Sequence, residues 1–215
     1  MEAELEAIDR EGVIEEALEE LGLTRGQVLK RAALGVAGAG AAGGLFVGAT
    51  PALAKSRATD VKVLKAALVF ERLGAAFYGE AMRSGALSGD TLTFARTLYQ
   101  HEVAHAVFVS NAIAAMGSKV PASPRFEFGS ITRSPKRFRA TAKSIEQLCV
   151  QVINGAGPLV TRPTLAAAGQ LVSVEARHVS YARQISGVTP AQEAYDPTTT
   201  AARAMSIAKS KGFIK

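Results

Sequence analysis

Two Glu-x-x-His pairs, each preceded by a lone glutamate, constrain the fold of this 215-residue chain more than any other feature. The lone glutamate precedes its pair by 31 residues in the first unit and by 29 in the second. Residues at i and i+3 of a helix lie on one face, so a glutamate and a histidine at this spacing can bind a common metal ion. The six residues are Glu71, Glu102 and His105 in the first unit, and Glu146, Glu175 and His178 in the second.

These side chains fall on apolar helical stripes or at their edges, which predicts that they lie in the core. An ionised carboxylate in a core costs several kcal/mol unless it is paired, and four converging carboxylates would repel one another. Two divalent cations would neutralise them. Coincidence is a poor explanation, because residues 55–215 contain only seven glutamates and three histidines. The pattern therefore predicts a dinuclear metal centre, in which oxygen and imidazole donors favour iron or manganese, although affinity alone would admit zinc or copper.

The stretch HEVAH, His101 to His105, also matches the H-E-x-x-H signature of zinc peptidases, in which both histidines bind zinc and the glutamate is the general base. Such an enzyme needs a third protein ligand and usually a sheet beside its helix. Glu127 follows two prolines and no sheet is predicted, so this alternative is the weaker one. His101 lies about 100° from Glu102 around a helix, and we expect it to be a surface imidazole or a hydrogen-bond partner of a ligand.

Helical periodicity recurs in four long blocks and one short C-terminal block, which predicts an all-α fold. Short connections around Gly85 and Gly155 make each consecutive pair of long helices an antiparallel hairpin. The segment 117–133 between the hairpins is long enough to cross the full length of a four-helix bundle. The expected helices span about 59–84, 88–116, 135–154, 162–187 and 199–210.

Four stretches of the chain resemble the ferritin-like superfamily, and especially its bacterial exported ferritin-like domain proteins, some of which are linked to desiccation. They are FERLGAAFYGEA (70–81), HEVAH (101–105), VEARHVSYA (174–182) and TTTAARAMSIAKSKGFI (198–214). The resemblance implies a ferritin-like antiparallel four-helix bundle over residues 55–215, with two Fe ions, or Mn or mixed metal ions, as cofactors. It also implies the roles of the ligands: Glu71 and His105 on one ion, Glu146 and His178 on the other, and Glu102 and Glu175 bridging the two.

The chemistry expected from this resemblance is the oxidation of ferrous iron by O₂ or peroxide, as in a ferroxidase or a peroxidase. Whether the protein is an enzyme stays open. One alternative is a stress or desiccation protein that holds metal without turnover, and the other is a structural bundle that acts as an interaction module without metal. Tyr78 and Tyr181 are expected near the centre as core tyrosines, with electron relay or a hydrogen bond to a ligand as the alternative. Cys149 is expected to be a buried core thiol, with contact to a metal ligand as the alternative, and as the single cysteine it excludes Cys-based zinc or iron–sulfur sites.

Residues 1–54 form a predicted leader and export signal. The uncharged, Ala/Gly-rich segment 32–54 follows the basic group 30–31 and ends in a small-x-small pattern. The small residues Ala52 and Ala54 fit a signal-peptidase site, which predicts cleavage after Ala54. If cleavage fails, the same segment would anchor the protein in the membrane.

The motif TRGQVLK (24–30) resembles the twin-arginine export signal, with Gly26 in place of the second arginine. This resemblance implies passage through the export machinery of the membrane as a folded protein. We therefore expect an exported protein in the periplasm, the cell wall or the extracellular space.

Charge is distributed unevenly along the chain. Residues 1–31 hold nine acids and four bases; of the 19 acids and 25 bases in total, 10 and 21 remain beyond them, a balance of +11. The bases are scattered except for PKRFR (135–139), and scattered bases are typical of a solvated surface, so no nucleic-acid partner is expected. Metal ions and O₂ or peroxide are the expected partners, and assembly into a homo-oligomer stays open.

Overall fold

A computed structural model describes residues 55–215, so the predicted leader, export signal and cleavage site at Ala52 and Ala54 lie outside the described residues. The described part is all-α, and its one β-type pairing is an isolated bridge between Phe126 and Ile214. None of its helices combines the length and apolarity that a membrane crossing requires. The elements are α4 (Arg57–Arg83), α5 (Gly89–Ala115), η1 (Ile131–Arg133), α6 (Pro135–Ala156), η2 (Gly157–Leu159), α7 (Arg162–Ile185) and α8 (Ala201–Ser210).

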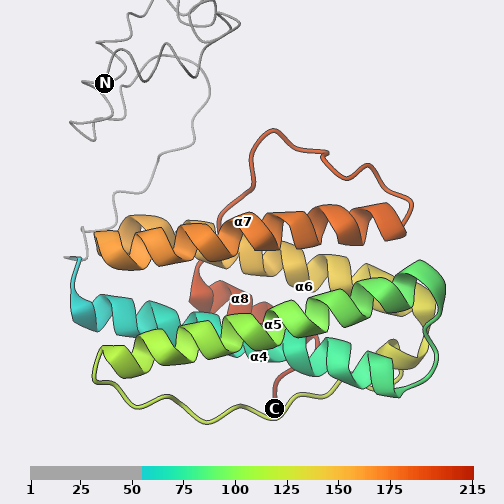
Figure 1. Cartoon of the computed structure of the whole chain (residues 1–215), viewed down its shortest axis with the longest axis horizontal. Coiled ribbons are helices and arrows are strands. Elements are labelled where there is room, and N and C mark those ends of the chain that lie inside the picture. The colour runs from blue at the N-terminus through green and yellow to red at the C-terminus, as the bar shows by residue number, and fades with distance from the viewer. Residues whose placement is uncertain (1–54) are drawn as a thin grey trace, which may run out of the picture. The chain divides into compact units, whose positions relative to one another are not determined.

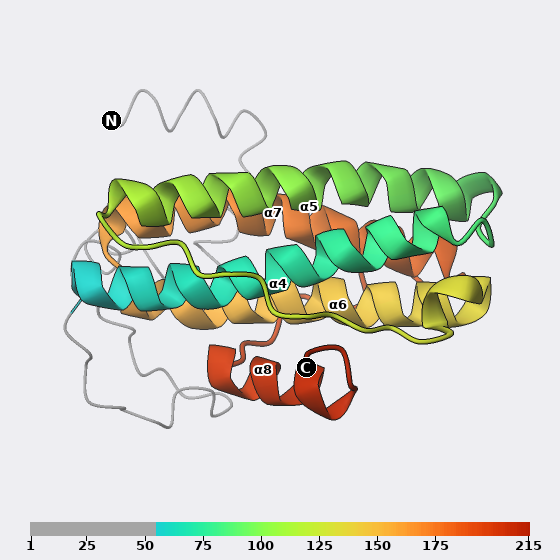
Figure 2. The ribbon, with the colours of Figure 1, turned by 90° about the horizontal axis from the view of Figure 1, so that it is seen from below.

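The four long helices form a bundle of two antiparallel hairpins, α4 with α5 and α6 with α7 (Figure 1). The segment between α5 and η1 runs along the bundle beside α4 and so returns the chain to the opposite end (Figure 2). Arg72 on α4 holds this crossover through a 2.7 Å hydrogen bond from its Nη1 atom to the carbonyl oxygen of Pro121. The predicted all-α four-helix bundle with one long crossover is therefore confirmed.

Local sequence signals set the helix ends close to the predicted positions. Ser134 caps α6 by accepting a hydrogen bond from the backbone N–H of Arg137, and a proline follows it at the first helical position. At the end of α5, Gly117 has a φ of 63°, and the N–H of Ser118 donates to the carbonyl of Ile113. This is a Schellman motif, in which glycine adopts the left-handed conformation without a Cβ clash. Ser88, the expected cap of α5, occupies the cap position but makes no side-chain bond to the helix.

The C-terminal helix α8 packs against α6 and α4 (Figure 2). The segment before it is seated on α6, where the N–H of Thr199 donates to the carbonyl of Gln151 at 3.0 Å. Gly155 allows this approach, because a Cβ there would overlap the carbonyl oxygen of Thr199. The last residues then pair with the crossover, since the N–H of Lys215 donates to the carbonyl of Arg125.

The apolar core has two parts along the bundle, with a layer of polar residues between them. The part near the α4–α5 turn contains an aromatic cluster in which Phe77 stacks on Phe138 at 5.1 Å. The other part packs around Leu68 and Ile113. Along α4, Glu71 lies between Leu68 and Phe77, and Glu102 and Glu175 interrupt the apolar stripes of α5 and α7 in the same way.

Asp60 in the first turn of α4 joins the two hairpins at one end of the bundle. Its carboxylate accepts hydrogen bonds from the backbone N–H of Thr161 (2.9 Å), the hydroxyl of Thr161 (2.5 Å) and the hydroxyl of Thr164 (2.8 Å). Thr161 is the N-cap residue of α7, and its side chain makes no cap hydrogen bond to that helix. Asp60, which belongs to α4, instead accepts the hydrogen bond of a backbone N–H group at the start of α7. Burial alone would raise the pKa of Asp60, but these hydrogen bonds outweigh it and lower the pKa.

The Asp60→Ala variant is expected to lose about 2 kcal/mol of unfolding free energy at pH 7, because buried donors of Thr161 and Thr164 are left unsatisfied. The pKa of Asp60 is lower in the folded than in the unfolded protein, so its contribution is present above about pH 4 and declines as the pH falls. Urea unfolding at pH 7 and pH 3 measures both effects. Asp196→Ala, at an exposed aspartate, is the control, and an equal loss in both variants would contradict the role of Asp60.

Candidate metal centre

The structure brings the six predicted site residues together in the layer between the two parts of the core. All six are buried, and the four carboxylates are at most 1% exposed. Each bundle helix contributes, because the acidic positions fall on the stripe that faces the other helices. The contributors are Glu71 from α4, Glu102 and His105 from α5, Glu146 from α6, and Glu175 and His178 from α7.

The six residues form two overlapping sets that could each hold a metal ion. Within each set, one donor atom per residue lies within 4.8 Å of all the others. Glu102 and Glu175 belong to both sets, which puts their carboxylates between the two positions. The sets are Glu71, Glu102, His105 and Glu175, and Glu102, Glu146, Glu175 and His178.

In the first set, His105 directs its Nδ1 atom toward two carboxylates. This atom lies 2.8 Å from Oε1 of Glu175 and 3.3 Å from Oε2 of Glu71. All three atoms are nevertheless without a hydrogen-bond partner, because the angles do not suit a hydrogen bond. The three atoms therefore lie close together without forming hydrogen bonds with one another.

In the second set, Nδ1 of His178 faces three carboxylates. It lies 3.1 Å from Oε2 of Glu146, 3.4 Å from Oε1 of Glu102 and 3.5 Å from Oε2 of Glu175. The contact with Glu146 is a hydrogen bond, whereas both oxygens of Glu102 and both of Glu175 have no hydrogen-bond partner. Both histidines therefore direct the same ring nitrogen, Nδ1, toward the carboxylates of the centre.

The donor set fits a pair of metal ions better than it fits an ordinary polar core. Buried polar atoms are nearly always hydrogen-bonded, because an unsatisfied one costs about 1–3 kcal/mol. Here six buried donor atoms of four residues have no such partner. Cations bound between them would satisfy all six and neutralise the carboxylates. The atoms concerned are Oε2 of Glu71, both carboxylate oxygens of Glu102, Nδ1 of His105 and both carboxylate oxygens of Glu175.

Burial opposes ionisation of three of the four carboxylates. It raises the pKa of Glu71 to about 7, that of Glu146 to about 6 and that of Glu102 well above its ordinary value, and the charge of Glu175 adds to each shift. Without cations, protons therefore remain on part of the cluster at neutral pH. Binding of a metal ion must displace them, which couples the metal affinity to pH.

Glu175 and the two histidines behave in the opposite way. Burial would raise the pKa of Glu175, but its close contacts with His105 and His178 lower it to about 2. Burial would lower the pKa of both histidines, yet the facing carboxylates raise the pKa of His105 to about 9 and of His178 to about 12. The ion-free centre thus holds imidazolium–carboxylate contacts at the positions where cations would neutralise the same carboxylates.

His101 lies beside the centre and belongs to neither of the sets found among residues 55–215. Its Nδ1 atom is 2.9 Å from Nε2 of His178, and the two rings stack with centroids 5.1 Å apart. His101 is exposed, so it links the back of a buried histidine to solvent. Burial, followed by the charges of His178 and His105, lowers the pKa of His101 and favours its neutral form. HEVAH therefore places its two histidines in different environments.

The remaining predicted neighbours have different surroundings. The hydroxyl of Tyr78 donates a hydrogen bond to Oε1 of Glu146, and the ring is fully buried among phenylalanines. Cys149 is a buried free thiol one turn after Glu146, and burial together with the nearby carboxylates raises its pKa. Tyr181 packs edge-on against Phe94, with ring centroids 4.9 Å apart, and is half-buried.

Gly74 is a residue of the centre that the sequence pattern did not identify. It lies one turn after Glu71 on α4, at the point where the carboxylate of Glu102 from α5 closely approaches the α4 backbone. A Cβ at this position would lie 2.5 Å from Oε2 of Glu102, closer than atoms can approach. The only sequence signal is a glycine inside a helix at i+3 from a predicted ligand.

The Gly74→Ala variant is expected to stay folded but to bind metal at least about tenfold more weakly, because the new methyl group displaces the Glu102 carboxylate. The Glu102 side chain can move, so the effect falls on the centre more than on the fold. Gly169→Ala in α7 is the control: a Cβ there meets nothing within 4 Å, and it should raise stability by about 0.5–1 kcal/mol. Competition with a chromogenic chelator measures the affinity, and unchanged binding by Gly74→Ala would contradict the close approach.

A family described as ferritin-like domain matches residues 59–188 of the chain, which is more than half of its length. The match includes α5, α6 and α7 in full and all but the first two residues of α4, and it ends before α8. It therefore contains all six residues of the centre. A search of curated proteins gives no match.

Proposed function

The chain belongs to the ferritin-like domain family, and we propose that its buried centre binds two iron ions and supports their oxidation by O₂ or peroxide. The observation that carries the proposal is the overlap of two donor sets through Glu102 and Glu175. The four residues of the first set, which include these two, hold six buried donor atoms without a hydrogen-bond partner. A single ion would leave one set unneutralised.

The geometry supports a symmetrical division of ligands. Each ion would take one lone carboxylate and one Nδ1 atom, and the shared carboxylates would contact both ions. The proposed pairs are Glu71 with His105 and Glu146 with His178, with Glu102 and Glu175 shared.

Oxygen and nitrogen donors favour iron or manganese over metals that prefer thiolate. Cys149 does not change this set, because burial keeps its thiol protonated. Manganese or a mixed pair is compatible with the same donors, so the identity of the metal is proposed from the family and is tested by elemental analysis.

When bound, ferrous ions would supply the electrons that reduce O₂ or peroxide. The chain's own residues hold the ligands in place. Tyr78 donates to Glu146 and so fixes the carboxylate that closes the second set. With Nδ1 of His178 given to a metal ion, its Nε2–H would donate to Nδ1 of His101, which fixes the tautomer and the ring orientation of the ligand. His101 is exposed and gives this hydrogen-bonded pair a contact with solvent.

Anaerobic ferrous protein mixed with O₂ or peroxide in a stopped-flow spectrophotometer tests the proposal. We expect ferric absorbance to develop faster than for the same iron in buffer, with saturation at two ions per chain. The variant Glu175→Ala should return the rate to that of buffer. If the protein binds two ions but oxidises them no faster than buffer, the centre holds metal without turnover, as in a stress or desiccation protein. If it binds no stoichiometric metal, both functions are excluded.

We also propose that the protein is exported. The support is in the sequence: the basic group 30–31, the uncharged segment 32–54 and the small residues Ala52 and Ala54. Mass spectrometry of the protein recovered from its host, by compartment, tests this. A mature N-terminus at Lys55 outside the cytoplasm supports cleavage, whereas an intact N-terminus in the membrane fraction indicates an anchor.

A further inference from the structure

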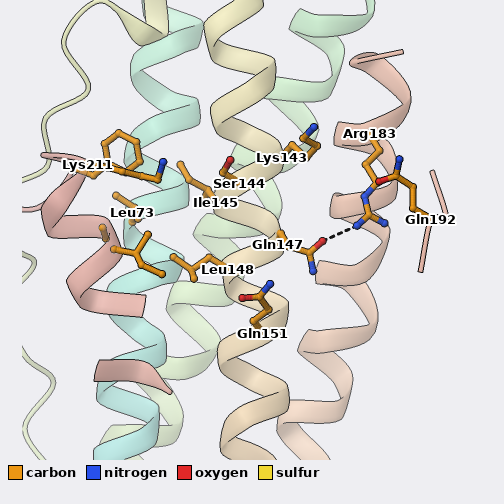
Figure 3. Close-up of a pocket in the computed structure, with 13 residues that line it drawn as sticks. Leu73, Lys143, Ser144, Ile145, Gln147, Leu148, Gln151, Arg183, Gln192 and Lys211 are labelled. Atoms are coloured by element: carbon orange, nitrogen blue, oxygen red, sulfur yellow. Dashed lines mark hydrogen bonds between the residues drawn. The ribbon is translucent and has the colours of Figure 1, made fainter. Parts of the chain in front are cut away.

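A cavity of about 360 Å³ lies over α6, between α8 on one side and the end of α7 on the other (Figure 3). It is separate from the metal centre, because none of the six residues of the centre lines it. Figure 3 shows Leu73, Leu148 and Lys211 toward α8, and Arg183 and Gln192 toward α7. Its volume is in the lower part of the range of small-molecule sites.

The floor of the cavity is apolar. Leu73 from α4, Ile145 from α6 and Phe213 after α8 are each at most 5% exposed and turn toward it. Leu148 and Ile207 are half-buried and form its walls. A ligand that covered these walls would be stabilised by the apolar surface that it removed from water.

The rim of the cavity is basic. Lys143, Arg183 and Lys211 line it together with serine and glutamine side chains, and no carboxylate does. Arg183 is already engaged, since it donates to Oε1 of Gln147 at 2.8 Å and to the carbonyl of Pro190 at 3.1 Å. Lys143 and Lys211 form no ion pair with any residue between 55 and 215. Two ammonium groups are therefore free to bind an anion.

From this combination we propose that the cavity binds a monocarboxylate with a medium-length acyl chain. The acyl chain would cover Leu148 and Ile207, and the carboxylate would bind an ammonium group of the rim, that of Lys143 or that of Lys211. A wholly polar anion would leave the floor uncovered, and an apolar molecule would leave the ammonium groups without a partner. The excess of 21 bases over 10 acids beyond residue 31 favours the approach of anions to this part of the protein as a whole.

Calorimetric titration of the full chain with octanoate tests the proposal, with octanol and octylamine as probes of the same length. We expect saturable binding of octanoate, about tenfold weaker binding of octanol and no measurable binding of octylamine. Charge reversal in Lys143→Glu or Lys211→Glu should weaken the binding of octanoate by about tenfold or more. Lys209→Glu is the matched control, because Lys209 is exposed on the same helix as the wall residue Ile207 but does not line the cavity.

A second variant tests the cavity itself. Ser144 lies at its exposed edge, so Ser144→Trp should fill the opening without disturbing the core and should abolish octanoate binding. Equal binding of octanoate and octylamine, or unchanged octanoate binding by Ser144→Trp and both charge reversals, would overturn the proposal. Metal content should be the same in all of these variants, so failure here is distinct from failure of the proposed metal centre.

Discussion

The Glu175→Ala variant is expected to bind neither ion of the proposed pair, because Glu175 contributes a donor to both sets. Its oxygens lie 2.8 Å from Nδ1 of His105 and 3.5 Å from Nδ1 of His178, so its removal opens both positions at once. Glu71 belongs to one set only. The Glu71→Ala variant should therefore retain about one ion per chain, and the contrast between the two variants separates a shared from an unshared ligand.

Elemental analysis after anaerobic loading with ferrous iron and gel filtration measures this difference, and circular dichroism checks that the helices are intact. Glu193→Ala removes an exposed glutamate outside the centre and should keep the metal content of the unaltered protein. Glu102→Ala should resemble Glu175→Ala, since Glu102 is the other shared residue. Two ions retained by both Glu102→Ala and Glu175→Ala would show that the ions bind elsewhere.

Much of the bundle could be predicted because its signals are local. Helix starts and ends depend on short patterns such as the Ser134 cap with its following proline and the left-handed Gly117. The clustering of the six residues could be predicted for the same reason, since the i, i+3 spacing of Glu102 and His105 fixes one helical face whatever the tertiary structure. Helical periodicity then indicates which face is buried.

The contacts that could not be predicted join residues far apart in the sequence. The capping of α7 by Asp60 spans 101 residues, and the approach of Glu102 to Gly74 depends on how α5 is rotated and shifted against α4. Periodicity gives the buried face of a helix but not its axial position against a neighbour. The packing of α8 across α6, which creates the cavity lined by Leu148 and Ile207, depends on the same unpredicted offsets.

Removal of the proposed ions should lower the melting temperature at pH 8 by on the order of 10 °C. A ligand present at 1,000 times its Kd stabilises the folded state by about 4 kcal/mol, and each kcal/mol corresponds to about 2–4 °C for a domain of this size. The difference in melting temperature between the ion-bound and the ion-free protein should shrink as the pH falls from 8 to 5. Over that range the ion-free centre takes up protons at Glu71, with a pKa of about 7, and at Glu146, with a pKa of about 6, and these protons compete with the cations.

Scanning calorimetry of iron-loaded and chelator-treated protein at the two pH values measures this coupling. Glu175→Ala is the control, because a variant that binds neither ion should melt at the same temperature with and without chelator. An equal fall in the melting temperature of the variant would show that the chelator destabilises the fold without removing these ions. If chelator changed the melting temperature of neither protein, the four buried carboxylates would have to be stabilised by their protons and imidazolium contacts alone. Metal binding would then not explain the six donor atoms without a hydrogen-bond partner.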